Sequence, residues 1–219
     1  MNKTSYPQAV YLDTNILTSL NRELNTPEYQ ELKNICDNLN ISIFVPQIVL
    51  DEWIFHNLEE QTKKDFKQLD SLLQKIGNYV ISEEDISVKI DKDKIIKELE
   101  KYLKNQITKV GIKIIQTPQI GLENLINRAV SKIRPFKKED KGFRDTIILY
   151  TILNYAKDFP KGNHLLITKD GDFDHSDVFN TASDFKVKLF IIKSIEEAKR
   201  SLQDFLQQAY KGKVWALNP

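Results

Sequence analysis

The chain alternates short apolar runs with longer segments in which apolar residues recur at helical spacing. The short runs are rich in β-branched and aromatic residues and end at turn-forming or charged residues, which predicts buried strands. Five segments have this pattern, at residues 9–12, 41–45, 112–115, 164–168 and 187–192. Because helical segments separate these strands, the order indicates a mainly parallel sheet covered by helices on both faces.

The longer segments have the apolar stripes of amphipathic helices. Helices are predicted to begin at Thr14 and after Pro46, and the carboxylate-rich segment from Lys169 to His175 is predicted to be a turn. Further helices are expected over residues 27–39, 59–76, 95–103, 122–133, 145–156 and 194–210. We therefore expect one three-layer α/β/α domain over residues 1–219, with a helical insertion at about residues 59–110.

Composition describes an ordinary globular protein, with 41% hydrophobic and 29% charged residues. The 32 basic and 31 acidic residues nearly cancel, so any nucleic-acid binding must come from a local patch. A single cysteine, Cys36, excludes an internal disulfide and a cysteine metal site, which favours a reducing cytoplasm. No apolar stretch is long enough to span a membrane, and the N-terminus leads into no signal-peptide core.

Four acidic residues occupy places that a parallel sheet would bring together. Asp13 ends the first strand, Glu52 lies early in the helix after the second strand, Asp145 opens an apolar helix, and Asp170 follows the strand that ends at Thr168. The carboxyl ends of parallel strands share one edge of the sheet, where such folds bind their ligands. Hard oxygen ligands without cysteine or a histidine cluster favour Mg²⁺ or Mn²⁺ over Zn²⁺. Each acid considered alone would be a helix cap or a surface residue.

Neighbouring acids compete for two of these positions. Asp51 directly precedes Glu52, and either could supply the ligand from that helix. Asp170 is followed by Asp172 and Asp174, and the three compete for the ligand position. Some of them need have no role in the site, because a turn often carries acids merely for solubility. At this point Asp172 is expected to assist or replace Asp170.

Four motifs together resemble those of the PIN domain, a metal-dependent ribonuclease fold. They are Leu-Asp-Thr-Asn-Ile-Leu at 12–17, Val-Pro-Gln-Ile-Val-Leu-Asp-Glu at 45–52, Arg-Asp-Thr-Ile-Ile at 144–148, and Ile-Thr-Lys-Asp-Gly-Asp-Phe at 167–173. The resemblance implies that the acids in the metal-binding and catalytic positions are Asp13, Glu52, Asp145 and Asp170, with Asp172 as a further ligand. The family's small polar residues fall on Asn15 and Thr168. The segment between Glu52 and Asp145 is longer than in compact toxin members, which indicates a larger branch of the family.

The resemblance implies an endoribonuclease that uses Mg²⁺ or Mn²⁺ to activate water and leaves a 3′-hydroxyl and a 5′-phosphate. A toxin, an RNA-processing enzyme and a defence effector would all have this pattern. Binding of an inhibitory protein and formation of a homodimer therefore both remain open alternatives. No membrane partner is expected. An aspartyl-phosphate phosphatase would need a second Asp where Asn15 stands. A non-catalytic PIN-like module that binds RNA or protein would usually lack at least one of the four acids, all of which are present.

A basic stretch between Arg128 and Arg144 leads directly into Asp145. We expect Lys141 and Arg144 to contact the phosphates of RNA and deliver the backbone to the metal site. Phe136 and Phe143 would either stack on unpaired bases or be buried. Outside this stretch, His56 lies one helical turn beyond Glu52, where it would orient that side chain, contact phosphate, or simply lie on the helix surface.

Overall fold

The computed structural model contains a five-stranded, wholly parallel sheet. It describes residues 7–77, 91–136, 141–159 and 162–217. The strands are β1 (Pro7–Leu12), β2 (Ser42–Pro46), β3 (Ile112–Ile115), β4 (Asn163–Ile167) and β5 (Lys188–Ile192), in the spatial order β3-β2-β1-β4-β5. The predicted strands are confirmed to within one or two residues at either end.

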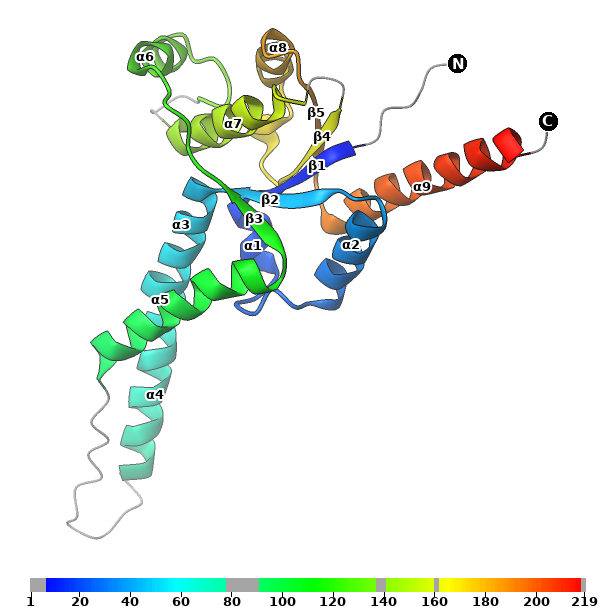
Figure 1. The fold of residues 1–219 in the computed structure, drawn as a ribbon. Coiled ribbons are helices and arrows are strands. Elements are labelled where there is room, and N and C mark those ends of the chain that lie inside the picture. Colours follow the sequence, from blue (N-terminus) through cyan, green and yellow to red (C-terminus); the bar gives the residue numbers. More distant parts are fainter. Residues whose placement is uncertain (1–6, 78–90, 137–140, 160–161, 218–219) are drawn as a thin grey trace.

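Helices cover both faces of this sheet (Figure 1). One side carries α1 (Thr14–Ser19), α2 (Pro27–Asn38), α3 (Gln47–Phe55) and α9 (Ile195–Leu217), and the other carries α6 (Leu122–Val130), α7 (Phe143–Ala156) and α8 (Ser176–Asp184). The predicted three-layer α/β/α class is therefore confirmed. The core is the apolar interior of these layers, where the central strand β1 is buried except at Gln8.

A helical arm extends from one side of the sheet (Figure 1). It consists of α3, a π-helical turn at His56–Gln61, α4 (Thr62–Gly77) and α5 (Lys92–Lys109), which leads back to β3. The helical segments predicted for this region are present, whereas the connection at residues 78–90 lies outside the described residues. None of the helices in the described ranges is both long and apolar enough to cross a membrane.

One helix was missing from the sequence-based prediction. Helix α8 follows the turn at Lys169 to His175, which contains a short 3-10 helix at Gly171–Phe173. The side chain of His175 caps α8 by accepting a hydrogen bond from the backbone N–H of Asp177, 3.2 Å away. A histidine cap is unusual, and the helix buries only Val178, Thr181 and Ala182 in its described part, so the sequence pattern was weak.

The pairing of β1 with β4 places the carboxylate-bearing segments side by side. Leu12 is in register with Ile167, and the N–H of Asp13 donates to the carbonyl of Ile167 at 3.1 Å. Asp13 and Thr168, the residues that follow these strands, therefore lie next to each other at the carboxyl edge of the sheet. Helices α1 and α3 begin at the same edge, as the topology requires.

Candidate active site

A cavity of about 550 Å³ opens at the carboxyl edge of the sheet. All four acids predicted to form the site contribute to its wall. The residues that line it are Asp13, Thr14, Asn15, Glu52, Lys141, Gly142, Phe143, Arg144, Asp145 and Asp170. The structure thus brings together side chains from four segments that are far apart in the sequence.

Asp13 is the most deeply buried acid of the cavity, with 5% of its surface exposed. One carboxylate oxygen, Oδ1, accepts a hydrogen bond from the backbone N–H of Thr14 at 2.7 Å and so caps α1. The other oxygen, Oδ2, accepts from Asn15 Nδ2 at 2.7 Å and from Thr168 Oγ1 at 2.5 Å. The helix-capping role expected of an isolated Asp and the site role are therefore filled by the same side chain.

Burial raises the pKa of the Asp13 carboxyl above its usual range. The hydrogen bonds from Thr168, Thr14 and Asn15 act in the opposite direction, while the charge of Asp170 adds to the increase. The ionised form of Asp13 is thus destabilised by the fold, and a cation placed in the cavity would relieve that cost.

Thr168 holds three parts of the site together. Its hydroxyl donates to Asp13 and accepts from Asn15 Nδ2 at 3.2 Å and from the backbone N–H of Asp170 at 3.0 Å. Thr168 is completely buried and its hydroxyl contacts Asp13, Asn15 and Asp170, whereas the substrate-binding role predicted for it stays a prediction. Asn15 does line the cavity, and its Oδ1 accepts from the N–H of Lys169 at 3.1 Å.

Glu52 reaches the cavity from the second turn of α3. Its Oε2 accepts a hydrogen bond from the hydroxyl of Thr14 at 2.7 Å, and its Oε1 forms an ion pair with Arg144. The competing Asp51 is exposed, accepts from Gln47 Nε2 at 2.7 Å, and does not line the cavity. The structure therefore places Glu52, and not Asp51, with the other acids. Sequence reasoning missed the contact of Thr14 with Glu52. The only sequence feature that could have indicated it is the position of Thr14 directly after Asp13.

Asp145 lies in the first turn of α7, where the helix dipole favours a negative charge. The chain enters this helix through Gly142, whose φ of 101° lies in the left-handed region. A Cβ atom there would come within 2.0 Å of the carbonyl oxygen of Pro135. The start of α7 can therefore approach the Pro135 segment only because residue 142 is glycine.

Gly142→Ala should lower the stability of the protein and impair the site at the same time. The strained φ costs of order 1–3 kcal/mol, and the contact with a backbone atom adds to it. Because the displaced segment carries Arg144 and Asp145, any activity of this cavity should fall more steeply than the melting temperature alone would explain. Gly171→Ala is the matched control, since a Cβ there meets nothing within 4 Å. Equal melting temperatures for the two variants would contradict this interpretation.

Of the acids in the turn after β4, Asp170 lines the cavity. Its Oδ1 accepts from the N–H of Asp172 at 2.9 Å and caps the 3-10 helix. Asp172 forms an ion pair with Arg134, and Asp174 lies within 3.4 Å of the ammonium group of Lys193. Neither Asp172 nor Asp174 lines the cavity, and the ligand role of Asp172 stays a prediction.

The basic stretch contributes less to the cavity than its charge suggested. Arg128 is buried and donates to Thr181 Oγ1 at 2.9 Å, and Arg134 is engaged by Asp172. Lys141 and Arg144 line the cavity, and their contact with RNA phosphates stays a prediction, whereas residues 137–140 lie outside the described part of the chain.

The two aromatic residues of the stretch differ. Phe136 is only 3% exposed and cannot stack on a base, so the buried alternative holds for it. Phe143 is 50% exposed at the cavity wall, and its ring packs edge-on against Phe136 with 6.4 Å between centroids. His56 lines a separate cavity with Trp53 and other residues, and so does not share the wall of the carboxylate cavity.

The donor set suits a divalent ion such as Mg²⁺ or Mn²⁺. Four carboxylates, with no sulfur ligand and no histidine, line the cavity, and the most buried of them has a raised pKa. As they stand, no three acid, histidine or cysteine side chains within the described ranges converge tightly enough to hold a metal. The Arg144 guanidinium instead supplies a positive charge to Glu52. Binding an ion therefore calls for side-chain adjustment at Glu52 and Arg144.

The fold and the cavity define a parallel α/β protein with a carboxylate-lined site at the carboxyl edge of its sheet. The PIN domain family profile matches residues 10–173, which is most of the chain and includes all four acids. The chain belongs to the PIN domain family, whose members are generally nucleases that use divalent metals. No curated protein and no solved structure gives a significant match.

Proposed function

We propose that this PIN domain is an endoribonuclease that depends on Mg²⁺ or Mn²⁺, held by Asp13, Glu52, Asp145 and Asp170. The observation that supports it most strongly is the shared cavity of these four acids, which come from four separate segments. When bound, the ions would activate a water molecule and offset the charge that develops on the phosphate. The carboxylates hold the ions, so the reaction needs no nucleophilic side chain.

The remaining residues of the cavity have supporting roles in this proposal. Thr168 and Asn15 fix the orientation of the Asp13 carboxylate, and Thr14 does the same for Glu52. Lys141 lines the cavity where a phosphate would approach the acids, and the exposed ring of Phe143 offers a stacking surface for an unpaired base. These features favour single-stranded or looped RNA as the substrate.

The proposal is tested by incubating the purified protein with single-stranded RNA in Mn²⁺ or Mg²⁺ and in EDTA. Cleavage in either metal should yield 5′-phosphate and 3′-hydroxyl ends and should stop in EDTA. Full activity in EDTA would refute the metal-dependent mechanism. If the protein bound RNA but cleaved it in neither metal, a non-catalytic PIN module would be favoured. The observation that supports this alternative is the Arg144–Glu52 ion pair, in which a guanidinium and not a metal ion neutralises the carboxylate.

Lys141→Ala should weaken RNA binding and reduce its salt dependence. Each phosphate contact contributes roughly one unit to the slope of log K against log salt, so the variant should lose about that much. The matched control is Lys188→Ala, which removes the same charge from an exposed residue at the start of β5. This residue lies at the amino ends of the strands, away from the cavity at their carboxyl ends. Filter-binding measurements between low and moderate salt provide the slopes. An unchanged slope for Lys141→Ala would place the RNA path elsewhere, such as along α5 near Lys101 and Lys104.

A further inference from the structure

Arg144 and Glu52 form an ion pair that joins two separate segments across the carboxylate cavity. Glu52 lies on α3 and Arg144 lies in the first turn of α7, and both residues line the cavity. The two oxygens of Glu52 have different partners, because Oε1 contacts the guanidinium of Arg144 and Oε2 accepts from the hydroxyl of Thr14 at 2.7 Å. A guanidinium therefore already lies beside one of the proposed metal ligands.

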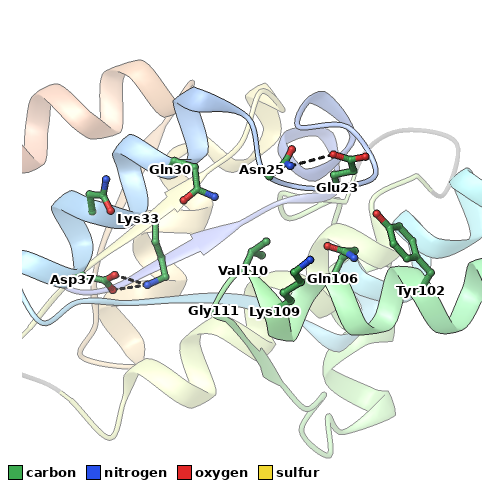
Figure 2. Close-up of a pocket in the computed structure, with 11 residues that line it drawn as sticks. Glu23, Asn25, Gln30, Lys33, Asp37, Tyr102, Gln106, Lys109, Val110 and Gly111 are labelled. Carbon is green, nitrogen blue, oxygen red and sulfur yellow. Dashed lines mark hydrogen bonds and ion pairs between the residues drawn. The ribbon is translucent and has the colours of Figure 1, made fainter.

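An ion pair at the wall of a second cavity shows what distinguishes this one. Lys33 and Asp37 line a cavity of about 600 Å³ between α2 and α5, and the ammonium group of Lys33 donates to Oδ1 of Asp37 at 2.6 Å (Figure 2). They lie four residues apart on α2, a spacing that makes side chains neighbours in any helix. Arg144 and Glu52, in contrast, meet only because α3 packs against α7, and they share their cavity with three further acids.

The acids of the cavity, and not its own helix, hold Arg144 in place. The N-terminus of a helix favours negative charge, which suits Asp145 and opposes a cation in the same turn. Four acids line the cavity against the two basic residues Lys141 and Arg144, which leaves a formal charge of −2. The cavity therefore still favours a cation with Arg144 present, and a divalent ion would compete with the guanidinium for Glu52.

Arg144 can leave Glu52 while Glu52 stays in position. The Arg144 side chain is 61% exposed and can turn toward solvent, whereas the Glu52 side chain is 25% exposed and keeps its hydrogen bond to Thr14. A guanidinium binds phosphate in the same bidentate geometry as it binds carboxylate. A phosphate of RNA at the cavity mouth is thus an alternative partner for Arg144.

We infer that Arg144 is a displaceable counter-ion of Glu52, which couples the binding of a divalent ion to the binding of RNA. Without a metal, the guanidinium neutralises Glu52. A cation held by the acids repels the guanidinium, and a phosphate of the RNA attracts it, so each ligand removes part of the cost of binding the other. Such a coupling is reciprocal. The inference rests on the proposed function, because it needs a metal at the carboxylates and RNA at the cavity.

The first test is a titration of the full chain with Mn²⁺ in the absence of RNA, followed by the EPR signal of free Mn²⁺. Arg144→Gln removes the charge and should bind Mn²⁺ about five- to tenfold more tightly than the wild type, within the usual range of coupling between sites. Arg144→Lys keeps a positive charge and should bind Mn²⁺ less tightly than Arg144→Gln. The matched control is Arg200→Gln, at an exposed position of α9 that does not line the cavity, and it should bind as the wild type does.

Lys141→Gln separates the displacement of Arg144 from the general electrostatics of the cavity. It removes the same charge from the cavity wall but leaves the Arg144–Glu52 ion pair, so the affinity for Mn²⁺ should rise clearly less than in Arg144→Gln. Equal affinities for the wild type and Arg144→Gln, or equal gains in the two variants, would overturn the inference while leaving the metal site intact. Absence of Mn²⁺ binding in all of these proteins would refute the metal site itself, and the inference with it.

The second test measures the coupling with a single-stranded phosphorothioate RNA, whose linkages keep their charge and resist cleavage. Fluorescence anisotropy gives its dissociation constant in EDTA and in Mn²⁺. Mn²⁺ should tighten binding to the wild type about fivefold or more, and binding to Arg144→Gln by a smaller factor. The same factor for both proteins would contradict a coupling through Arg144. Because the RNA stays intact, this result is independent of whether the cavity cleaves RNA.

Discussion

Asp145→Asn should reduce RNA cleavage by more than about a hundredfold while leaving the fold intact. Residues that only orient metal ligands typically contribute about 10–100-fold to activity, so loss of a ligand itself should cost more. The effect on stability should be small, because Asp145 is a partly exposed residue in the first turn of α7, where a charge contributes about 0.3–1 kcal/mol. Cleavage rates in Mn²⁺ and a melting curve of the same preparation provide both quantities.

Asp51→Asn is the matched control for this prediction. It neutralises an acid directly beside Glu52, but Asp51 is exposed and does not line the cavity. Its cleavage rate should stay close to that of the wild type. If Asp145→Asn retained wild-type activity, or if both variants lost activity equally, the assignment of the carboxylate cavity as the active site would be wrong.

Thr168→Val should impair both stability and cleavage, although Thr168 is completely buried. The substitution keeps the shape of the side chain but removes the hydroxyl that binds Asp13, Asn15 and the N–H of Asp170. Leaving buried polar groups without partners costs about 1–3 kcal/mol. Because the Asp13 carboxylate would also lose its fixed orientation, we expect cleavage to fall by about 10–100-fold.

Two variants separate this effect from the general cost of changing a buried threonine. Thr168→Ser keeps the hydroxyl and should recover most of the activity. Thr151→Val removes a buried hydroxyl that donates only within α7, to the carbonyl of Ile147 at 2.7 Å. It should affect stability alone. If Thr168→Val and Thr151→Val lowered cleavage equally, Thr168 would have no specific role in positioning the site.

The sequence predicted most of the fold because the strands are unusually clear. Strands β1, β2 and β4 are short apolar runs flanked by polar or turn-forming residues, the pattern of parallel strands buried on both faces, whereas the edge strands β3 and β5 also have exposed positions. Helix α8 was missed because its apolar face is short and its cap is a histidine. The long arm was anticipated only as helical segments, since apolar spacing does not specify how α3 continues through a π-helical turn into α4.

The sequence predicted which acids lie together where topology determines their places, but not the contacts that depend on side-chain packing. Asp13, Glu52, Asp145 and Asp170 line one cavity because strands and helices of a parallel sheet meet at one edge. The sequence could not show that Phe136 is buried or that Asp172 pairs with Arg134, because both depend on contacts between distant segments. The contact of Thr14 with Glu52 likewise depends on how α1 packs against α3.

The raised pKa of Asp13 links the site to stability. Because the folded state raises this pKa, the folded protein binds the proton more tightly than the unfolded chain does. The stabilising contribution is therefore complete below the ordinary pKa of an aspartate and is lost as the pH rises through the raised value. At neutral pH the metal-free protein bears this cost, and a bound cation would offset it.

The most direct test of a metal site formed by these acids is a set of melting curves, in EDTA and in Mn²⁺, for the wild type and Asp170→Asn. Asparagine is as good a helix cap as aspartate, so the variant loses a negative charge near Asp13 without losing the cap to Asp172. We predict that Asp170→Asn melts above the wild type in EDTA, and that Mn²⁺ raises the melting temperature of the wild type clearly more than that of the variant. If the variant melted below the wild type in EDTA and gained as much from Mn²⁺, the four acids would not form a metal site.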